Sequence, residues 1–335
     1  MKNFTYYRPK TVEEAVGLLD AAWGKTELLA GGTDLLDLQK EYISQPDKVV
    51  SLGGVKLDTI EILDRRPPIF KIGAGAKLAD IVALKDIREY CPALTTAAGM
   101  VGGPQIRNMG TLGGNLCQRN RCWYFRDEHV NCLLKGGEKC FALDGDNRYH
   151  AVFTKGHPCV IVNPSTLAPA LIALGATADV QGPNGKKRTV KLSEFFRAPQ
   201  DPTQREHTLA PNEVVTLVTI NTVSGLKNAS YEVRHKQSYD WPLVQAVAAF
   251  KDDGGKATDV RIVLGHVAPT PHVAEMAAKA LEGKAITEET AAAAGKAATE
   301  GARPLARNEY KLKLIEVAVK RAVLLAAGKK PYWEA

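Results

Sequence analysis

Hydrophobic and polar residues follow one another along this 335-residue chain in short blocks that predict both helices and strands. Residues 11–22 have the spacing of a helix, with Thr11 as its N-cap and Glu14 three residues later, as in a capping box. Three short apolar runs then predict strands. They cover residues 27–30, 48–52 and 69–74.

The middle of the chain changes character twice. Residues 78–100 have helical periodicity and many alanines, whereas residues 101–115 (VGGPQIRNMGTLGGN) are so rich in glycine and helix breakers that we predict no regular helix there. Residues 116–160 are polar and aromatic, carry cysteines and have no clean period. A loop of this length inside a compact domain is usually functional.

The last third of the chain predicts a second, smaller domain. Strands are expected at 176–181, 188–192 and 213–220, and a short Ser/Gly/Lys linker at 223–227 then interrupts the pattern. Beyond the linker we expect a strand, a helix, a hairpin and then helices rich in alanine. The helix is predicted at 243–249, the hairpin turn at 252–255 and its second strand at 259–267. The pattern as a whole predicts an α+β protein with domains at 1–223 and 224–330.

Composition excludes several classes of protein. Hydrophobic residues make up 45% and charged residues 24% of the chain, which is ordinary for a globular protein. The net charge of +7 comes from Lys and Arg that are spread along the sequence, and no nucleic-acid-binding motif accompanies them, so we expect no nucleic acid as partner. No apolar stretch is long enough to span a membrane, and the N-terminus has no secretory signal pattern, so folding in the cytoplasm is expected.

Two glycine-rich turns are candidates for binding a diphosphate. They are Leu29-Ala30-Gly31-Gly32-Thr33-Asp34 and Gly110-Thr111-Leu112-Gly113-Gly114-Asn115. A diphosphate needs several peptide N–H groups converging on it, and glycine allows the backbone to come close or to take a positive φ. Ordinary tight turns are the alternative, because short glycine motifs have many false positives. No G-x-G-x-x-G opens a helix here, so a Rossmann site is disfavoured.

Five of the six cysteines lie between positions 117 and 159. In a chain without a secretory signal, such a cluster favours a metal over disulfides. The spacing Cys122-x9-Cys132-x7-Cys140-x18-Cys159 matches neither a zinc knuckle nor a ferredoxin run. Buried free thiols are the alternative, and the spacing alone leaves both open.

Three of these stretches together resemble a known family. LLAGGTDLL, IGAGAKLAD and GGPQIRNMGTLGGNL are similar to segments of the flavoprotein (medium) subunits of the xanthine dehydrogenase and carbon monoxide dehydrogenase family of molybdenum hydroxylases. The resemblance covers nearly the whole chain. It implies a PCMH-type, vanillyl-alcohol-oxidase-like FAD-binding domain of two α/β subdomains, followed by a small C-terminal domain.

The resemblance also implies which residues contact FAD. The expected cofactor-binding residues are Leu29, Ala30, Gly31, Gly32, Thr33, Asp34, Leu35, Val101, Gly102, Thr111, Gly113, Gly114, Asn115 and Lys236. Two positions depart from the family: Thr166 stands where an Asp usually holds the adenosine portion, and Glu232 stands where a Lys is frequent.

A subset of these subunits carries a [4Fe-4S] cluster at the position of the cysteine segment. It includes 4-hydroxybenzoyl-CoA reductase and the periplasmic aldehyde oxidoreductases, and this segment looks most like the aldehyde oxidoreductase version. The resemblance implies the ligands Cys122, Cys132, Cys140 and Cys159. Cys117 is a competing candidate that we expect to be a spare thiol near the flavin, and Cys91 is expected in the core. One of the nearby histidines could replace a thiolate, but solvated or structural roles are expected for His129, His150 and His157.

The resemblance predicts an electron-transfer subunit of a larger complex. No [2Fe-2S] motif and no molybdopterin domain are evident, so we expect a small subunit with two [2Fe-2S] clusters and a large molybdopterin subunit as partners. Electrons would leave through FAD and the [4Fe-4S] cluster to an external electron acceptor, and no residue of this chain need be a catalytic acid or base. The alternatives are a stand-alone flavin oxidase of the vanillyl-alcohol type and a non-enzymatic scaffold. The complex would work in the cytoplasm, or in the periplasm after export with a signal-bearing partner.

Overall fold

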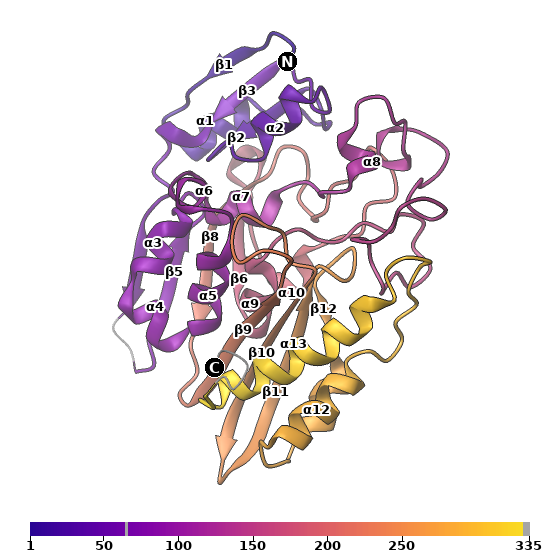
Figure 1. Ribbon diagram of the computed structural model, residues 1–335. Coiled ribbons are helices and arrows are strands. Elements are labelled where there is room, and N and C mark those ends of the chain that lie inside the picture. Colours follow the sequence, from indigo (N-terminus) through magenta and orange to yellow (C-terminus); the bar gives the residue numbers. More distant parts are fainter. Residues whose placement is uncertain (64–65, 331–335) are drawn as a thin grey trace.

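The N-terminal part of the chain forms a small parallel sheet with two short helices. The computed structural model describes residues 1–63 and 66–330. The sheet has the order β1-β3-β2, and Figure 1 shows it at the top of the molecule beside the N-terminus. Its elements are β1 (Thr5–Tyr7), α1 (Val12–Gly17), β2 (Thr26–Leu29), α2 (Leu35–Lys40) and β3 (Lys48–Ser51).

The predicted N-cap of the first helix is confirmed, but the helix is shorter than expected. The Thr11 hydroxyl accepts from the Glu14 amide at 3.1 Å. The Glu14 carboxylate accepts from the Lys10 amide instead of the Thr11 amide, so the capping box is incomplete. The helix ends at Gly17, five residues before the predicted end at residue 22.

A five-stranded antiparallel sheet of order β4-β5-β8-β6-β7 forms the second layer. The residues 78–100, predicted as helical, form three helices and not one, because Leu84 and Cys91 interrupt the turns and Pro92 starts a new helix. The strands are β4 (Ile60–Leu63), β5 (Ile69–Gly73), β6 (Thr177–Gln181), β7 (Lys187–Lys191) and β8 (Val214–Asn221). The helices packed around it are α3 (Leu78–Ala83), α4 (Lys85–Tyr90), α5 (Pro92–Met100), α9 (Leu167–Ala173) and α10 (Leu192–Phe195).

The glycine-rich segment 101–115 contains two short helices, so the prediction of no helix there was wrong. Pro104 opens the first, where its missing N–H costs nothing. Thr111 caps the second, because its hydroxyl accepts from the Gly114 amide at 3.1 Å. The helices are α6 (Pro104–Met109) and α7 (Leu112–Cys117).

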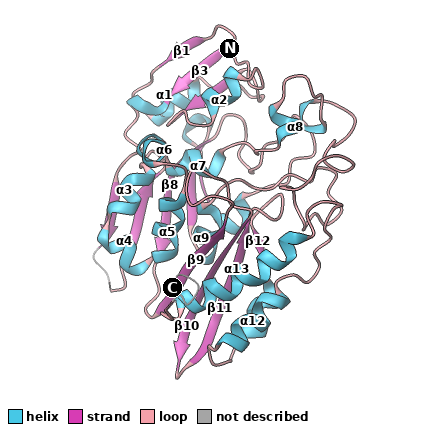
Figure 2. Ribbon diagram, viewed as in Figure 1, coloured by secondary structure: helices cyan, strands magenta, loops and turns pink. Residues whose placement is uncertain are grey.

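The C-terminal part is a four-stranded antiparallel sheet, order β12-β11-β10-β9, with helices on one side (Figures 1 and 2). The helix predicted at 243–249 was wrong, because these residues belong to a strand. In that strand Val244 and Ala246 pack in the C-terminal core, whereas Val247 and Ala249 pack in the core around the five-stranded sheet. A strand buried on both faces loses its alternating pattern and cannot be told from a buried helix. The elements are β9 (Leu226–Val233), β10 (Val244–Asp253), β11 (Lys256–Gly265), β12 (His272–Val273), α11 (Glu275–Leu281), α12 (Glu288–Ala297) and α13 (Tyr310–Ala326).

The cysteine segment is largely irregular, as predicted. It contains α8 (Trp123–Arg126) and one short 3-10 helix, and Figure 2 shows it as a set of loops beside α8. The C-terminal domain fixes its end, because the Asn308 side chain donates to the carbonyls of His150 and Ala151. The buried Lys311 ammonium donates to the carbonyl of Tyr149. Over the described ranges, no helix is long and apolar enough to cross a membrane.

Candidate flavin cavity and cysteine cluster

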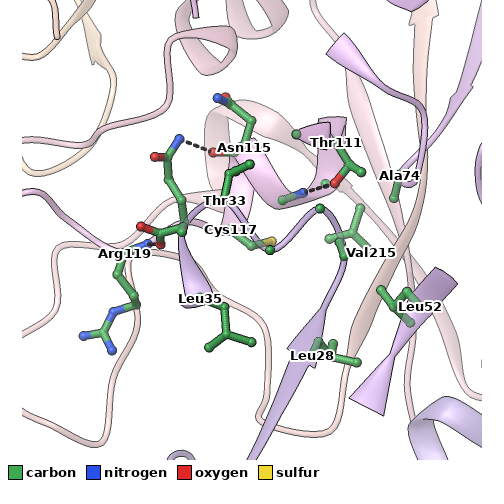
Figure 3. A pocket seen from close by; sticks show the side chains of 18 of the residues that line it. Leu28, Thr33, Leu35, Leu52, Ala74, Thr111, Asn115, Cys117, Arg119 and Val215 are labelled. Carbon is green, nitrogen blue, oxygen red and sulfur yellow. Dashed lines mark hydrogen bonds between the residues drawn. The ribbon is translucent and has the colours of Figure 1, made fainter. Parts of the chain in front are cut away.

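A cavity of about 610 Å³ lies where the small parallel sheet, the segment around α6 and α7 and the C-terminal domain meet. Its size is that of a pocket for a large organic ligand. Figure 3 shows that Thr33, Leu35, Thr111 and Asn115 surround the same space. The two glycine turns, far apart in the sequence, therefore lie on one cavity.

The first turn needs glycine for two separate reasons. A Cβ atom on Gly31 would lie 2.1 Å from the carbonyl oxygen of Met109, so the first turn packs directly against the residue that precedes the second turn. Gly32 has a φ of +75°, which L side chains rarely adopt. This close approach brings the peptide groups of both turns to the cavity wall.

The second turn is also closely packed. The Gly113 amide donates to the carbonyl of Ala74 at 2.8 Å, and a Cβ atom on Gly113 would lie 2.9 Å from the Ala74 Cβ. The Asn115 side-chain oxygen accepts from the Ser165 hydroxyl at 2.8 Å. This bond fixes Asn115 against the segment that leads into α9.

The cavity wall contains most of the residues that the sequence predicts as FAD contacts. Those present are Ala30, Gly31, Gly32, Thr33, Asp34, Leu35, Val101, Gly102, Thr111, Gly113, Gly114 and Asn115. Leu29 and Lys236 do not line it. Leu29 ends β2, and its side chain lies behind Gly32, whereas Lys236 is exposed in the loop after β9. These placements leave their proposed contact with the cofactor a prediction.

Several residues of the cavity wall were not predicted from the sequence. Arg121 and Trp241 come from different parts of the chain, and the guanidinium carbon lies 4.7 Å from the centre of the Trp241 ring. The ring of Tyr239 packs on Gly103, where a Cβ atom would collide with it. Tyr239 and Trp241 stay 62% and 40% exposed, so they form an outer rim of the cavity. Of these contacts, only that of Arg121 could have been suspected from the sequence, because several arginines surround Cys122.

The two positions that depart from the family have different surroundings. Thr166 lines the cavity, and its carbonyl accepts from the buried Gln245 amide at 2.9 Å. Glu232 is not on the wall, and both of its carboxylate oxygens are buried without a hydrogen-bond partner among the described residues. Burial raises the pKa of Glu232 to about 7, although the Arg234 Nε atom lies 3.8 Å away.

The four cysteines predicted as ligands come together beside the cavity. Cys122, Cys132 and Cys159 pack in one cluster, and Cys140 lies next to it with Val160. The Cys159 thiol, as hydrogen-bond donor, lowers the pKa of the Cys140 thiol, and the same contact raises the pKa of Cys159. Burial raises the pKa values of Cys122 and Cys132, and the nearby Cys140 adds a smaller electrostatic contribution in the same direction.

The remaining cysteines lie elsewhere. Cys117 lines the cavity, and burial raises its pKa to about 12. Cys91 is fully buried in the core around the five-stranded sheet. Within the described residues, no group of three or more His, Cys, Asp or Glu side chains has the geometry to hold a single metal ion. A [4Fe-4S] cluster would be held by four thiolates, one for each iron, so it would not require the geometry of a single-ion site.

The three histidines of the segment have distinct roles. His157 accepts from the Cys159 amide and donates to the Ala198 carbonyl, both at 3.1 Å, so it is structural. His129 is exposed. His150 is buried, with its Nε2 atom 3.1 Å from the Cys122 sulfur. Burial and the nearby Lys311 lower the pKa of His150 to about 4, so its ring is neutral.

Two family models divide the chain between them. The model for the FAD binding domain in molybdopterin dehydrogenase matches residues 2–221, and the model for the CO dehydrogenase flavoprotein C-terminal domain matches residues 229–326. This chain is an FAD-binding subunit of the molybdenum hydroxylase family. The FAD subunit is therefore an oxidoreductase component with an FAD-binding domain and a small C-terminal domain, as the sequence predicts. The exact division at residue 223 stays a prediction.

Relatives of the FAD subunit span almost its full length. It is 34% identical to the aldehyde oxidoreductase FAD-binding subunit PaoB of Escherichia coli (strain K12), over 94% of this chain and 95% of that protein. It is 28% identical to the carbon monoxide dehydrogenase medium chain of Hydrogenophaga pseudoflava, over 96% of both chains. A solved structure of carbon monoxide dehydrogenase from Hydrogenophaga pseudoflava superposes with a TM-score of 0.75 at 27% identity, covering 97% of this chain and 98% of that one.

Both candidate sites suit the groups that the sequence predicts. The cavity of the FAD subunit has both glycine turns on its wall, where Gly31 and Gly113 allow the chain to pack closely and Gly32 takes a positive φ, so that peptide groups of both turns face the space a nucleotide would fill. The cysteine cluster offers sulfur atoms from four side chains in an apolar setting, and thiolates are the ligands of iron–sulfur clusters.

Proposed function

We propose that this chain holds FAD between its two glycine turns and a [4Fe-4S] cluster on Cys122, Cys132, Cys140 and Cys159. The observation that carries the proposal is the convergence of both turns and the cysteine segment on neighbouring sides of one cavity. Arg119, Arg121 and Cys117 line the cavity and belong to the stretch that leads into Cys122. The two cofactor sites would therefore be adjacent, as electron transfer between them requires.

Within this proposal, each part of the chain has a defined task. The turns at Gly31–Gly32 and Gly113–Gly114 supply backbone groups to the diphosphate. The residues Val101 and Gly102 offer backbone groups to the rest of the cofactor. Tyr239 and Trp241 form the outer rim that limits access of solvent to the cavity.

Around the cysteines, aromatic residues would exclude water from the cluster. The Trp123 ring lies edge-on to Tyr124, Tyr149 and His150, with centroid distances of 6.2, 5.4 and 5.7 Å. The Tyr124 ring stacks on Phe141 at 6.2 Å. Dry surroundings and hydrogen bonds to sulfur are two of the factors that set the potential of an iron–sulfur cluster.

We further propose that the chain works in a complex with a small subunit carrying two [2Fe-2S] clusters and a large molybdopterin subunit. The names of its relatives, an FAD-binding subunit and a medium chain, support this arrangement. FAD, when bound, exchanges electrons singly or in pairs, and an iron–sulfur cluster exchanges one at a time. The chain's contribution is to hold these groups close together, away from water, on the path to an external acceptor.

Purification of the chain alone tests the proposal. We expect a flavin absorption spectrum together with broad iron–sulfur absorption, and about four irons per chain. A protein that contains flavin but no iron after anaerobic purification and reconstitution would overturn the [4Fe-4S] assignment and favour a stand-alone flavin oxidase. A protein without flavin would overturn the cavity assignment.

A further inference from the structure

Asp34 belongs to the first glycine turn, but its side chain faces the cysteine segment. Its Oδ2 atom accepts from the Arg119 amide at 3.0 Å. Its Oδ1 atom accepts from the guanidinium groups of Arg121, at 2.8 Å, and Arg126, at 2.6 Å. Asp34 also lines the flavin cavity and does not cap α2 with its side chain. Its carboxylate is thus used to bind the segment that follows α7.

These three donors flank the first proposed cluster ligand. The Nε atom of Arg126 donates to the Asn120 carbonyl at 2.9 Å, and the Asn120 side chain accepts from the Cys122 amide at 3.1 Å. Arg126 also donates to Asp37 at 2.7 Å. Asp34 is therefore connected to the Cys122 backbone through two residues, Arg126 and Asn120.

The segment is also anchored on its other side. Arg119 and Asn120 bind the fully buried Glu206 carboxylate, at 2.8 Å for the guanidinium and 2.7 Å for the amide. Glu206 is 1% exposed, and Asp34 and Arg126 have side chains 20% and 11% exposed. Partly buried charge-assisted bonds of this kind hold a fixed geometry, and removing one partner leaves the other charge uncompensated.

We propose that Asp34 is a positioning residue that couples the occupancy of the FAD site to that of the cluster site, which rests on the proposed function. FAD seated against residues 31–35 fixes the turn, and the turn fixes Asp34. Asp34 in turn fixes residues 119–126 and with them the Cys122 ligand. Because coupling between two sites is reciprocal, an assembled cluster makes the turn a better FAD site by the same factor.

The test measures FAD affinity in a cycle of four proteins: wild type and Asp34→Asn, each with and without iron. The flavin is removed first, and FAD is titrated back while its fluorescence is followed. In the wild type we expect binding about tenfold weaker without iron, within the usual range of such couplings. In Asp34→Asn the ratio of the two dissociation constants should fall toward one, even where both affinities drop. A residue with a merely structural role would weaken both forms and leave the ratio unchanged.

Reciprocity gives a second readout on the same proteins. At equilibrium with a chelator, bound FAD should raise the fraction of the wild type that retains iron, and it should have no such effect in Asp34→Asn. Asp146→Asn is the matched control, because it removes the Arg148 ion pair, 2.7 Å long and exposed, within the same segment. It should leave the ratio at the wild-type value. If Asp34→Asn does not fold, Arg126→Gln opens the same network from the side away from the cavity and should lower the ratio.

The outcomes separate this inference from the proposed function. A wild-type chain that takes up no iron overturns the [4Fe-4S] assignment. A wild-type chain that takes up iron but binds FAD equally well with and without it overturns the coupling. A wild-type ratio that persists in both Asp34→Asn and Arg126→Gln overturns the role of Asp34.

Discussion

The Nε2 atom of His150 lies 3.1 Å from the Sγ atom of Cys122. The other ring nitrogen, Nδ1, is buried and has no hydrogen-bond partner in the part of the chain that the structure describes. The imidazole proton is therefore best placed on Nε2, where the Cys122 sulfur accepts it. Hydrogen bonds to the sulfurs are one of the means by which a protein sets the potential of an iron–sulfur cluster.

His150→Phe should lower the midpoint potential of the cluster, because the variant removes a hydrogen bond that stabilises the more negative, reduced state. The phenyl ring keeps the packing against Trp123, whose ring centre lies 5.7 Å from that of His150. A potentiometric titration followed by EPR measures the shift. His129→Phe, at an exposed position in the same segment, should leave the potential unchanged. Equal midpoint potentials in His150→Phe and the wild type would refute a hydrogen bond from His150 to the Cys122 sulfur.

Gly32→Val should abolish FAD binding, because the side chain and the altered backbone disturb the turn on the cavity wall. The control is Gly24→Val, since Gly24 also has a positive φ, +93° against +75° for Gly32. Nothing lies within 4 Å of a Cβ at Gly24, and Gly24 does not line the cavity. Both variants should lose about 1–2 kcal/mol of stability from backbone strain. Only Gly32→Val should lose the flavin absorption. Normal flavin occupancy in Gly32→Val would refute the proposal that the first glycine turn binds the diphosphate.

Glu232→Gln should stabilise the chain above neutral pH. Burial raises the pKa of Glu232 from 4.5 to about 7, so its contribution to stability is present below pH 4.5 and is lost as the pH rises through 7. The ionised form costs up to about 3 kcal/mol at pH 8. The melting temperature of Glu232→Gln should therefore exceed that of the wild type at pH 8 and equal it at pH 4.5. The same difference at both pH values would argue against a buried, titrating carboxyl.

The sequence predicted strands correctly where a short apolar run is bounded by turn residues. The strands β2, β3, β5 and β8 lie within two residues of their predicted bounds. The strand β10 was not predicted. Its two faces belong to two different cores, and the resulting apolar run, VQAVAAF, resembles a buried helix. The short helices α6 and α7 were missed because glycine and proline argue against a helix until capping and close packing are known.

Some residues of the candidate site could be predicted from the sequence, and others could not. The glycine turns and the cysteines could be identified because their residue types are required by the chemistry of a diphosphate and of iron. The rim residues Tyr239 and Trp241 could not, since their position depends on how the C-terminal domain packs against the cavity. The role of Asp34 was also hidden, because its partners Arg121 and Arg126 lie about ninety residues further along the chain.

The iron content of Cys132→Ser, measured with its flavin content against the wild type and Cys117→Ser, tests the central claim most directly. The account predicts about four irons and one FAD per wild-type chain, loss of iron with FAD retained in Cys132→Ser, and iron retained in Cys117→Ser. Cys117 is the suitable control because it lines the flavin cavity and is not among the four clustered thiols. Unchanged iron in Cys132→Ser, or loss of iron in Cys117→Ser with Cys132→Ser unaffected, would contradict it.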